Sequence, residues 1–361
     1  MWPTEYQEKL KIRIKNIFTS STVKNFCYVN PSFLEGNDKE GVFNTTYFSD
    51  INSIVTNEWL QLELENSYEL PCVYIVTAHG SDISNLIWSL RARAHPSSIY
   101  CLWHFDNHVA YLENYKSAIA VDFNFISHNT GVPGYLTNPI SSIVEHVPAC
   151  CVQFGLDEIK ENITKNPYYT RSSKALFNYI IYDSAPRTSI IMQLKENIRD
   201  IADFKLMHSS DRTRYWSMDK KERILEWTSY KCSVIVPLVQ DLSTRVFDAL
   251  ATGQIPIIPE EILDLDTIIT NEIQAALGIV RIKNLSAASV RAGISEAIEI
   301  FDQQGLEGTV NRAEYILSNG TTGHRISSIL ASLTKIATNQ KELIFGQGAN
   351  GCGIYVNSKS T

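Results

Sequence analysis

Several short signatures of common enzyme classes are missing from the sequence. No GxxxxGK[ST] run is present, and no GxGxxG run follows a predicted strand and opens a helix. The main sequence evidence for a P-loop protein or for a dinucleotide-dependent oxidoreductase is therefore missing. A GxSxG run is also missing, which weakens an α/β-hydrolase assignment. The seven cysteines include no CxxC pair, and several lie in apolar runs, which is typical of reduced thiols in a core.

Long hydrophobic runs and excess positive charge are also missing. No segment reaches the length of a membrane-spanning helix, and the charged, amphipathic residues 1–18 do not resemble a signal peptide. The formal net charge of −7 comes without a basic cluster, so nucleic acid is not an expected partner. We expect a soluble cytoplasmic protein without a transmembrane segment. Peripheral contact with a membrane is compatible with this expectation.

The second half of the 361 residues alternates between short apolar runs and amphipathic stretches. Such alternation predicts a parallel sheet wrapped by helices, a Rossmann-like domain. After Ser286 the sequence is helical in pattern to about Asn339. The strands are expected at residues 175–182, 204–207, 232–239, 255–259 and 278–282.

The first half alternates less regularly. Strands are expected at residues 71–78, 98–103, 118–127 and 147–154, with a helix at 81–93. A length of 361 residues favours two domains. We expect an N-terminal domain over residues 1–155, a polar linker over 156–173, a C-terminal domain over 174–345, and a poorly ordered tail over 346–361.

Residues 231–261 carry the clearest chemical pattern. A β-branched strand is followed by the polar turn Gln240–Thr244 and then by a helix with Arg245 in its first turn. Ser243 is the expected N-cap, which leaves first-turn N–H groups and a guanidinium to face an anion. The next strand ends before Glu260, which places this acidic residue at the same sheet edge.

This segment resembles the donor-binding strand–helix–strand of GT-B glycosyltransferases, including group 1 and exostosin-like enzymes. The resemblance lies in the run STRVFDALATGQIPII, residues 243–258. It implies a GT-B-like α/β fold, with two Rossmann-like domains facing a central cleft and a helical C-terminal segment. It also implies that Ser243, Thr244 and Arg245 approach the donor phosphates and that Asp248 stands at the ribose position.

The sequence departs from this pattern at one point. Retaining members often carry two glutamates with seven residues between them, whereas Gln240 and Asp248 occupy those positions here. The stereochemical outcome is therefore open. Arg187, after the first strand of this half, is a further candidate for the donor phosphates or an exposed helix-start residue. His208, after the second strand, could contact the donor or lie in a surface loop.

In the first half, the run Trp103–His108 directly follows a predicted strand. Asp106, assisted by His104 or His108, is the expected general base for an acceptor hydroxyl. A structural cap and, less favoured, a metal site are the alternatives. His79 and Asp82 also lie between a strand and a helix and form a second candidate pair.

No metal site is expected. Asp264 and Asp266 form a DxD run, the pattern of metal-dependent GT-A enzymes, but they lie beyond the donor helix and are interpreted as a loop and helix cap. We therefore expect a metal-independent glycosyltransferase that moves a sugar from a nucleotide-sugar, which is a substrate and not a cofactor. The expected acceptor is a hydroxyl of a glycan or lipid-linked glycan in surface polysaccharide biosynthesis. A GT-B-like sugar-nucleotide epimerase and a non-catalytic binding protein are the alternatives.

Overall fold

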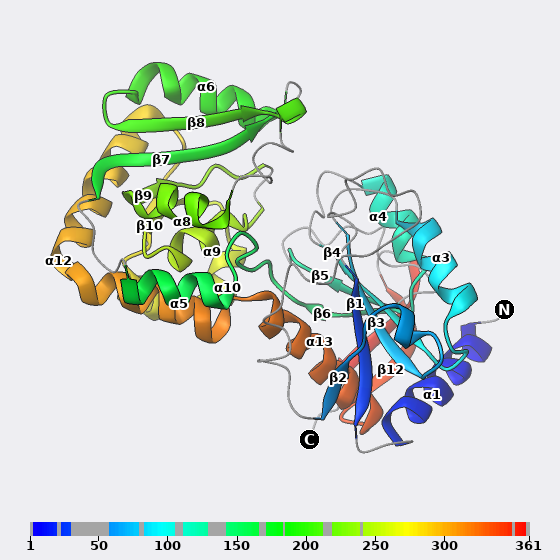
Figure 1. The fold of residues 1–361 in the computed structure, drawn as a ribbon. Coiled ribbons are helices and arrows are strands. Elements are labelled where there is room, and N and C mark those ends of the chain that lie inside the picture. The colour runs from blue at the N-terminus through cyan, green and yellow to red at the C-terminus, as the bar shows by residue number, and fades with distance from the viewer. Residues whose placement is uncertain are drawn as a thin grey trace. The chain divides into compact units, whose positions relative to one another are not determined.

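The chain forms two compact units. The computed structural model describes residues 3–19, 23–29, 58–78, 83–104, 111–128, 142–165, 171–182, 185–211, 219–238, 241–348 and 351–358. Unit 1 comprises residues 1–148 and 323–361, and unit 2 comprises residues 149–322. Each unit has its own sheet with helices around it (Figure 1). The expected α/β architecture with two Rossmann-like units is thus confirmed.

Unit 1 is built on an eight-stranded sheet in the order β12-β13-β6-β5-β4-β3-β1-β2. All neighbouring strands are parallel except the antiparallel pair β12–β13. Strands β3, β4 and β5 consist largely of fully buried residues, as is typical of a parallel sheet covered on both faces. The strands are β1 (Lys24–Val29), β2 (Trp59–Gln61), β3 (Cys72–Ala78), β4 (Ile99–His104), β5 (Phe123–Ile126), β6 (Ser142–His146), β12 (Lys341–Gly348) and β13 (Gly351–Ser358).

The helices of unit 1 come from both of the chain segments that form it. The N-terminal helix contributes Leu10, Ile14 and Ile17 to the core at helical spacing. No helix among the described residues is both long and apolar enough to cross a membrane. The helices are α1 (Pro3–Thr19), α3 (Ser84–Arg93), α4 (Tyr111–Ala118), α13 (Thr322–Ala337) and the short 3₁₀ helix η3 (Glu65–Ser67).

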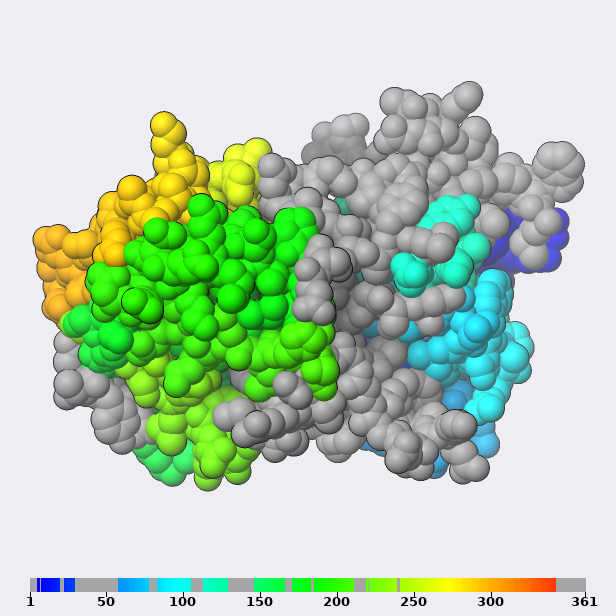
Figure 2. Space-filling view, turned by 90° about the horizontal axis from the view of Figure 1, so that it is seen from above, coloured from blue at the N-terminus to red at the C-terminus, as the bar shows by residue number. Residues whose placement is uncertain are grey.

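Unit 2 has a five-stranded, fully parallel sheet in the order β11-β10-β9-β7-β8. Its strands are β7 (Ser172–Ile181), β8 (Ala202–His208), β9 (Tyr230–Val234), β10 (Ile255–Pro259) and β11 (Val280–Ile282). Edge strand β8 and helix α6 form part of the green surface in the space-filling view (Figure 2). The helices are α5 (Leu156–Lys165), α6 (Pro186–Ile198), the 3₁₀ helix η5 (Ser209–Asp211), α8 (Lys220–Thr228), α9 (Arg245–Ala251), α10 (Asp264–Ile268), α11 (Asn271–Leu277) and α12 (Ala287–Asn319).

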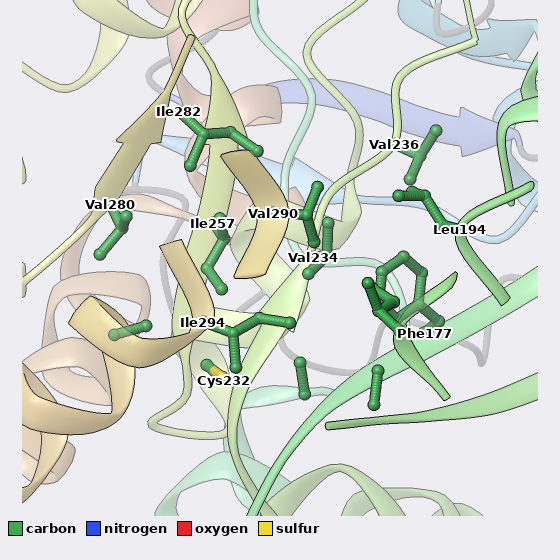
Figure 3. Close-up of a cluster of buried hydrophobic side chains, with 14 of the residues drawn as sticks. Phe177, Leu194, Cys232, Val234, Val236, Ile257, Val280, Ile282, Val290 and Ile294 are labelled. Atoms are coloured by element: carbon green, nitrogen blue, oxygen red, sulfur yellow. The ribbon is translucent and has the colours of Figure 1, made fainter. Parts of the chain in front are cut away.

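The core of unit 2 lies where α6 and α12 pack against the sheet (Figure 3). Phe177 from β7, Ile257 from β10 and Ile294 from α12 are among its fully or nearly fully buried members. Helix α12 is interrupted at Gly305, where φ is 56° and ψ is −142°, values that glycine adopts far more readily than other residues. The predicted helical segment after Ser286 is therefore present, as two helices joined at this residue and followed by α13.

The unit boundaries differ from those expected from the sequence. The expected linker 156–173 contains α5, which packs against α8 and α12 and belongs to unit 2. Helix α13 belongs to unit 1, whereas it was expected in the C-terminal domain. The expected strand 147–154 is wrong, because this segment holds only an isolated bridge between Cys151 and Thr321.

The expected C-terminal tail contains strand residues. Residues 341–348 and 351–358 form the antiparallel pair β12–β13, which joins the sheet of unit 1 through β6. Residues 346–351 have the spacing GxGxxG, but Gly346 and Gly348 lie in β12 and Gly351 begins β13. The dinucleotide-binding signature requires a strand followed by a helix, so this run does not represent one.

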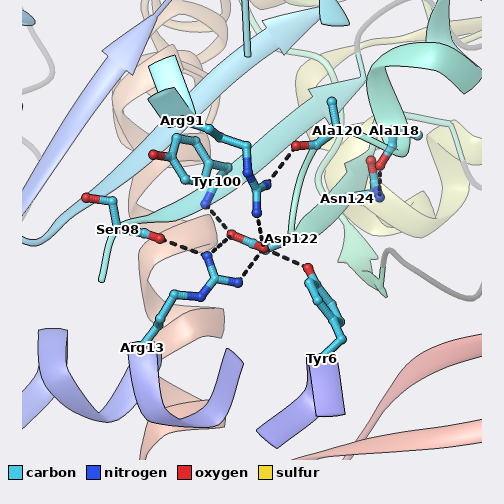
Figure 4. A network of polar contacts seen from close by, with 9 residues as sticks. All are labelled: Tyr6, Arg13, Arg91, Ser98, Tyr100, Ala118, Ala120, Asp122 and Asn124. Carbon is cyan, nitrogen blue, oxygen red and sulfur yellow. Dashed lines mark hydrogen bonds and ion pairs between the residues drawn. The ribbon is translucent and has the colours of Figure 1, made fainter. Parts of the chain in front are cut away.

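Asp122 ties α1 and α3 to the sheet of unit 1 (Figure 4). Its carboxylate is fully buried and accepts hydrogen bonds from Arg13 at 2.6 and 3.0 Å, from the Tyr6 hydroxyl at 2.7 Å and from the Tyr100 amide at 2.9 Å. Arg91 lies 3.3 Å away. Burial alone would raise the pKa of Asp122, but the charges of Arg13 and Arg91 and the hydrogen bonds from Arg13 and Tyr6 hold it below the ordinary value.

We predict that Asp122→Asn lowers the free energy of unfolding of unit 1 by about 3–5 kcal/mol, because it leaves buried cations without their counter-charge. The folded pKa lies below the unfolded one, so the carboxylate contributes its full stabilisation above about pH 4 and loses it as the pH falls further. Urea denaturation between pH 2.5 and 7 measures both effects. Asp200→Asn, at an exposed ion pair with Arg291, is the control. Equal effects of the two substitutions would contradict this prediction.

Candidate functional site

The sheet of unit 2 reverses its winding between β7 and β9. The chain passes from β7 outward to β8 and then crosses to β9 on the other side of β7. In open parallel sheets, ligands bind outside the carboxyl ends of the strands at such a point. Helix α6 follows β7, and α9 follows β9, so the first turns of both helices lie at this end of the sheet.

The pairing of β7 with β9 stops before β7 ends. The last paired residues are Leu176 and Ser233, whereas β7 continues to Ile181 beside β8. Beyond that point the Tyr179 hydroxyl donates to the Val234 carbonyl at 2.8 Å and accepts from the Val236 amide at 2.7 Å. Two side chains thus replace the missing strand pairing, since Arg245 Nε also donates to the Asn178 carbonyl at 2.9 Å.

Two arginines share the ring of Tyr179. The guanidinium carbon of Arg245 lies 4.4 Å from the ring centroid, and that of Arg187 lies 5.4 Å from it. Both distances are typical of cation–π contacts. Arg187 is in the first turn of α6 and only 8% exposed, whereas Arg245 is the first residue of α9 and half-buried.

The two positive charges lack an acidic partner in ion-pair contact within the part of the chain that the structure describes. Among the described residues, no carboxylate forms an ion pair with Arg187 or Arg245. Burial, and then the nearby charge of Arg245, lower the pKa of Arg187, while Tyr179 and then Asp241 oppose this shift. A cation at a helix N-terminus is also disfavoured by the helix dipole. An anion placed between the guanidiniums would relieve all of these costs.

A second arginine pair in unit 2 is compensated differently. Arg171 and Arg312 lie over Phe301, at 5.3 and 5.4 Å from its ring centroid. Arg312 donates to the carbonyls of Gly253 and Leu277, at the C-terminal ends of α9 and α11, and Arg171 donates to the Tyr230 carbonyl. Helix C-termini favour cations, so the two carbonyls fix Arg312 within the fold, although burial and the charge of Arg171 lower its pKa to about 9.

The residues around Arg245 only partly match the sequence prediction. Thr244, and not Ser243, is the N-cap of α9, and it makes no side-chain capping hydrogen bond. The Ser243 hydroxyl lies 3.4 Å from the Arg245 amide and is nearly buried. Helix α9 has only seven residues, so the guanidiniums and not the helix terminus give this site its positive charge.

Asp248 lies inside unit 2. It is fully buried and accepts hydrogen bonds from the amides of Val152 and Gln153 at 3.1 and 3.3 Å and from the Gln153 side chain at 3.0 Å. Burial raises its pKa in spite of these bonds. With no exposed surface, Asp248 cannot contact a ribose directly in this conformation. Its role here is to hold residues 152–153 against α9.

The other second-half candidates are separate from the arginine pair. His208 is exposed and contacts the Ser210 hydroxyl at 2.9 Å. Glu260 is exposed after β10 and offers its backbone carbonyl to Arg281. Asp266 forms an ion pair with Arg281 at 2.8 Å, whereas Asp264 is buried in the first turn of α10. Within the described part of the chain, no three metal-ligating side chains come together.

In unit 1, the described residues include one member of the predicted catalytic cluster. His104 ends β4, is fully buried and contacts Asn124 Oδ1 through Nε2 at 2.7 Å. Burial lowers its pKa to about 4, so the imidazole is neutral near pH 7. It lacks the exposure that a base acting on an acceptor needs. Five other predicted residues lie outside the described residues: Asp106, His108, His79, Asp82 and Gln240.

Tyr179 was not identified from the sequence. The run ALFNYIIY predicts a buried strand, and an aromatic residue in such a strand is normally a core residue. A polar hydroxyl close to the carboxyl end of this strand is the one signal that could have indicated a site.

Comparison with protein-family models and with curated protein sequences gives no match. Among solved structures, the N-terminal domain of Candida albicans trehalose-6-phosphate phosphatase is 11% identical, with 76% of this chain and 74% of that chain covered and a TM-score of 0.49. An α,α-trehalose-phosphate synthase (UDP-forming) from Burkholderia vietnamiensis is 10% identical, with 74% and 73% covered and a TM-score of 0.48. A GtfA/B complex is 11% identical, with 76% of this chain and 59% of that chain covered and a TM-score of 0.39. At these TM-scores the likenesses identify neither a family nor an activity.

We predict that inorganic phosphate raises the melting temperature of the protein through the arginine pair. A ligand of the native state at about a hundred times its Kd stabilises by about 2.7 kcal/mol. Arg187→Gln should remove most of this shift, because it removes one of the two cations. It should also stabilise the phosphate-free protein slightly, because it ends the repulsion between them.

Arg291→Gln is the matched control. Arg291 is an exposed arginine of the same unit, paired with Asp200 and away from Tyr179. Thermal-shift titration of the three proteins with phosphate at constant ionic strength measures the difference. An equal phosphate response of wild type and Arg187→Gln would exclude the arginine pair as the anion site.

Proposed function

We propose that the protein is a nucleotide-sugar-dependent glycosyltransferase of GT-B type, whose unit 2 binds the donor. The observation that carries the proposal is the pair of guanidiniums over Tyr179, at the sheet position where α/β folds bind ligands. The diphosphate of a nucleotide-sugar matches this pair in charge, since it offers several anionic oxygens to planar donors.

The proposed chemistry uses the same charges. Cleavage of the bond between the sugar and the diphosphate places additional negative charge on the leaving phosphate. Arg187 and Arg245, fixed before the reaction begins, would stabilise that charge without a divalent metal. Ser243 and Thr244 precede Arg245 and are the proposed hydroxyl contacts of the phosphates. Asp248 supports this segment from inside the unit and is proposed as a positioning residue.

Unit 1 is the proposed acceptor unit. Its strand β4 is buried, parallel and ends at His104, and side chains that act on substrates commonly follow the carboxyl ends of such strands. Asp106 is the proposed base that takes the proton from an acceptor hydroxyl of a growing glycan. The buried His104 is proposed to fix the end of β4 through Asn124 and not to exchange protons with the acceptor.

We predict that a nucleotide-sugar binds in the absence of divalent metal and that Arg245→Gln weakens this binding by about 1.5–3 kcal/mol, the contribution of a charged hydrogen bond. Calorimetry with UDP-, GDP-, dTDP-, ADP- and CMP-sugars, each with and without EDTA, identifies the donor and measures the loss. Arg291→Gln serves again as the control. Binding that requires Mg²⁺ or Mn²⁺ would contradict the proposed metal-free site.

We further predict that Asp106→Asn lowers turnover about 10²–10⁴-fold, the usual contribution of a general base, and leaves donor affinity unchanged. Asp157→Asn, an exposed carboxylate on α5, is the matched control. Sugar transfer is followed by release of the nucleoside diphosphate with and without glycan acceptors. Normal turnover of Asp106→Asn would transfer the proposed role to His79 and Asp82, and donor conversion that ignores every acceptor would indicate an epimerase.

A further inference from the structure

We propose that Tyr179 is the positioning residue of the diphosphate site and that its ring and hydroxyl together set the spacing of Arg187 and Arg245. This inference rests on the proposed function for the identity of the ligand. The geometric argument does not depend on which ligand binds, because it concerns the contacts that hold the guanidiniums of Arg187 and Arg245 near one ring.

Tyr179 connects the two chain segments that carry the arginines. It belongs to β7, which leads into α6 and Arg187. Its hydroxyl bonds to Val234 and Val236, where β9 ends and the chain turns toward Arg245. Because the strand pairing has already stopped at Leu176 and Ser233, these two bonds fix the connection after β9 to β7.

The Tyr179 ring stabilises the two guanidiniums, a role that a carboxylate has at other arginines of the chain. Two guanidiniums within 4.4 and 5.4 Å of one ring centroid repel each other, and the negative face of the ring offsets part of that repulsion. A carboxylate would neutralise the arginines and compete with the ligand. An aromatic ring holds them while their N–H groups stay available to an anion.

The pair over Phe301 shows that the ring alone does not require a hydroxyl. Arg171 and Arg312 lie over a phenylalanine and are fixed by backbone carbonyls. At Tyr179 only Arg245 has such a bond among the described residues, through Nε to Asn178. Tyr179 therefore carries a hydroxyl at a place where the neighbouring strands are not paired, whereas Phe301 has no hydroxyl and its arginines are fixed by backbone carbonyls.

The test measures the affinity for inorganic pyrophosphate by calorimetry in wild type, Tyr179→Phe and Tyr179→Leu. We expect Tyr179→Leu to weaken binding about tenfold, because both cation–π contacts are lost. Tyr179→Phe should weaken it less, because the ring remains. Phe301→Leu removes the other ring beneath two arginines and should leave the affinity unchanged even though it lowers the melting temperature. Tyr230→Phe is the control for Tyr179→Phe. It removes a tyrosine hydroxyl elsewhere in unit 2, which donates a hydrogen bond to Asp203.

A double-mutant cycle separates positioning from general stability. In an Arg245→Gln background, Tyr179→Leu should weaken pyrophosphate binding much less than in wild type, because the two residues act as a unit. Pyrophosphate affinity within twofold of wild type in Tyr179→Leu, or full additivity in the cycle, would overturn the inference.

If Tyr179→Leu does not fold, the comparison of Tyr179→Phe with Tyr230→Phe decides. Wild type that binds pyrophosphate but no nucleotide-sugar would contradict the proposed function and leave the role of Tyr179 intact. Absence of pyrophosphate binding in wild type would contradict both.

Discussion

The early end of the pairing between β7 and β9 is the constraint on which the candidate site depends. A parallel sheet that reverses its winding sends the connections after two neighbouring strands to opposite faces of the sheet. Here β7 also extends beyond its last pair with β9, so the backbone groups past that point need other partners. Tyr179 and Arg245 supply those partners from side chains. As a result, an aromatic ring and two guanidiniums are fixed at the one place in unit 2 where topology favours a ligand.

The arginines of the chain show why this pair differs from the others. Arg13 and Arg91 are balanced by the buried carboxylate of Asp122, in an arrangement that joins helices to a sheet. Arg312 is balanced by carbonyls at two helix C-termini. Arg187 and Arg245 share the ring of Tyr179 and lie at helix N-termini, and among the described residues the Asn178 carbonyl, bonded by Arg245, is the one backbone partner of the two guanidiniums. We propose that an anionic ligand binds at this pair, for which the described residues offer no ion-pair partner, whereas the arginines bonded to Asp122 and to helix C-termini stabilise the fold.

Periodicity in the sequence predicts the alternating strands and helices that form the sheet of unit 2, and strand β10 has the predicted bounds. Arg187 and Arg245 remain predicted donor contacts, proposed from their positions after apolar strands and from the resemblance to GT-B enzymes. Asp248 was assigned a ligand-binding role by resemblance, but its burial depends on residues 152–153, about 95 positions away in the sequence. The amphipathic pattern of α5 is short and polar, so it was interpreted as a linker until its packing against α8 and α12 placed it in unit 2. Long-range contacts of this kind leave no local signal in a single sequence.

A crystal structure of the protein with a bound nucleoside diphosphate tests the central claim most directly. The account predicts phosphate oxygens within hydrogen-bond distance of the guanidiniums of both Arg187 and Arg245, with the ring of Tyr179 beneath the two cations. A nucleoside diphosphate bound elsewhere in the protein, with both guanidiniums free of contact to it, would contradict the account.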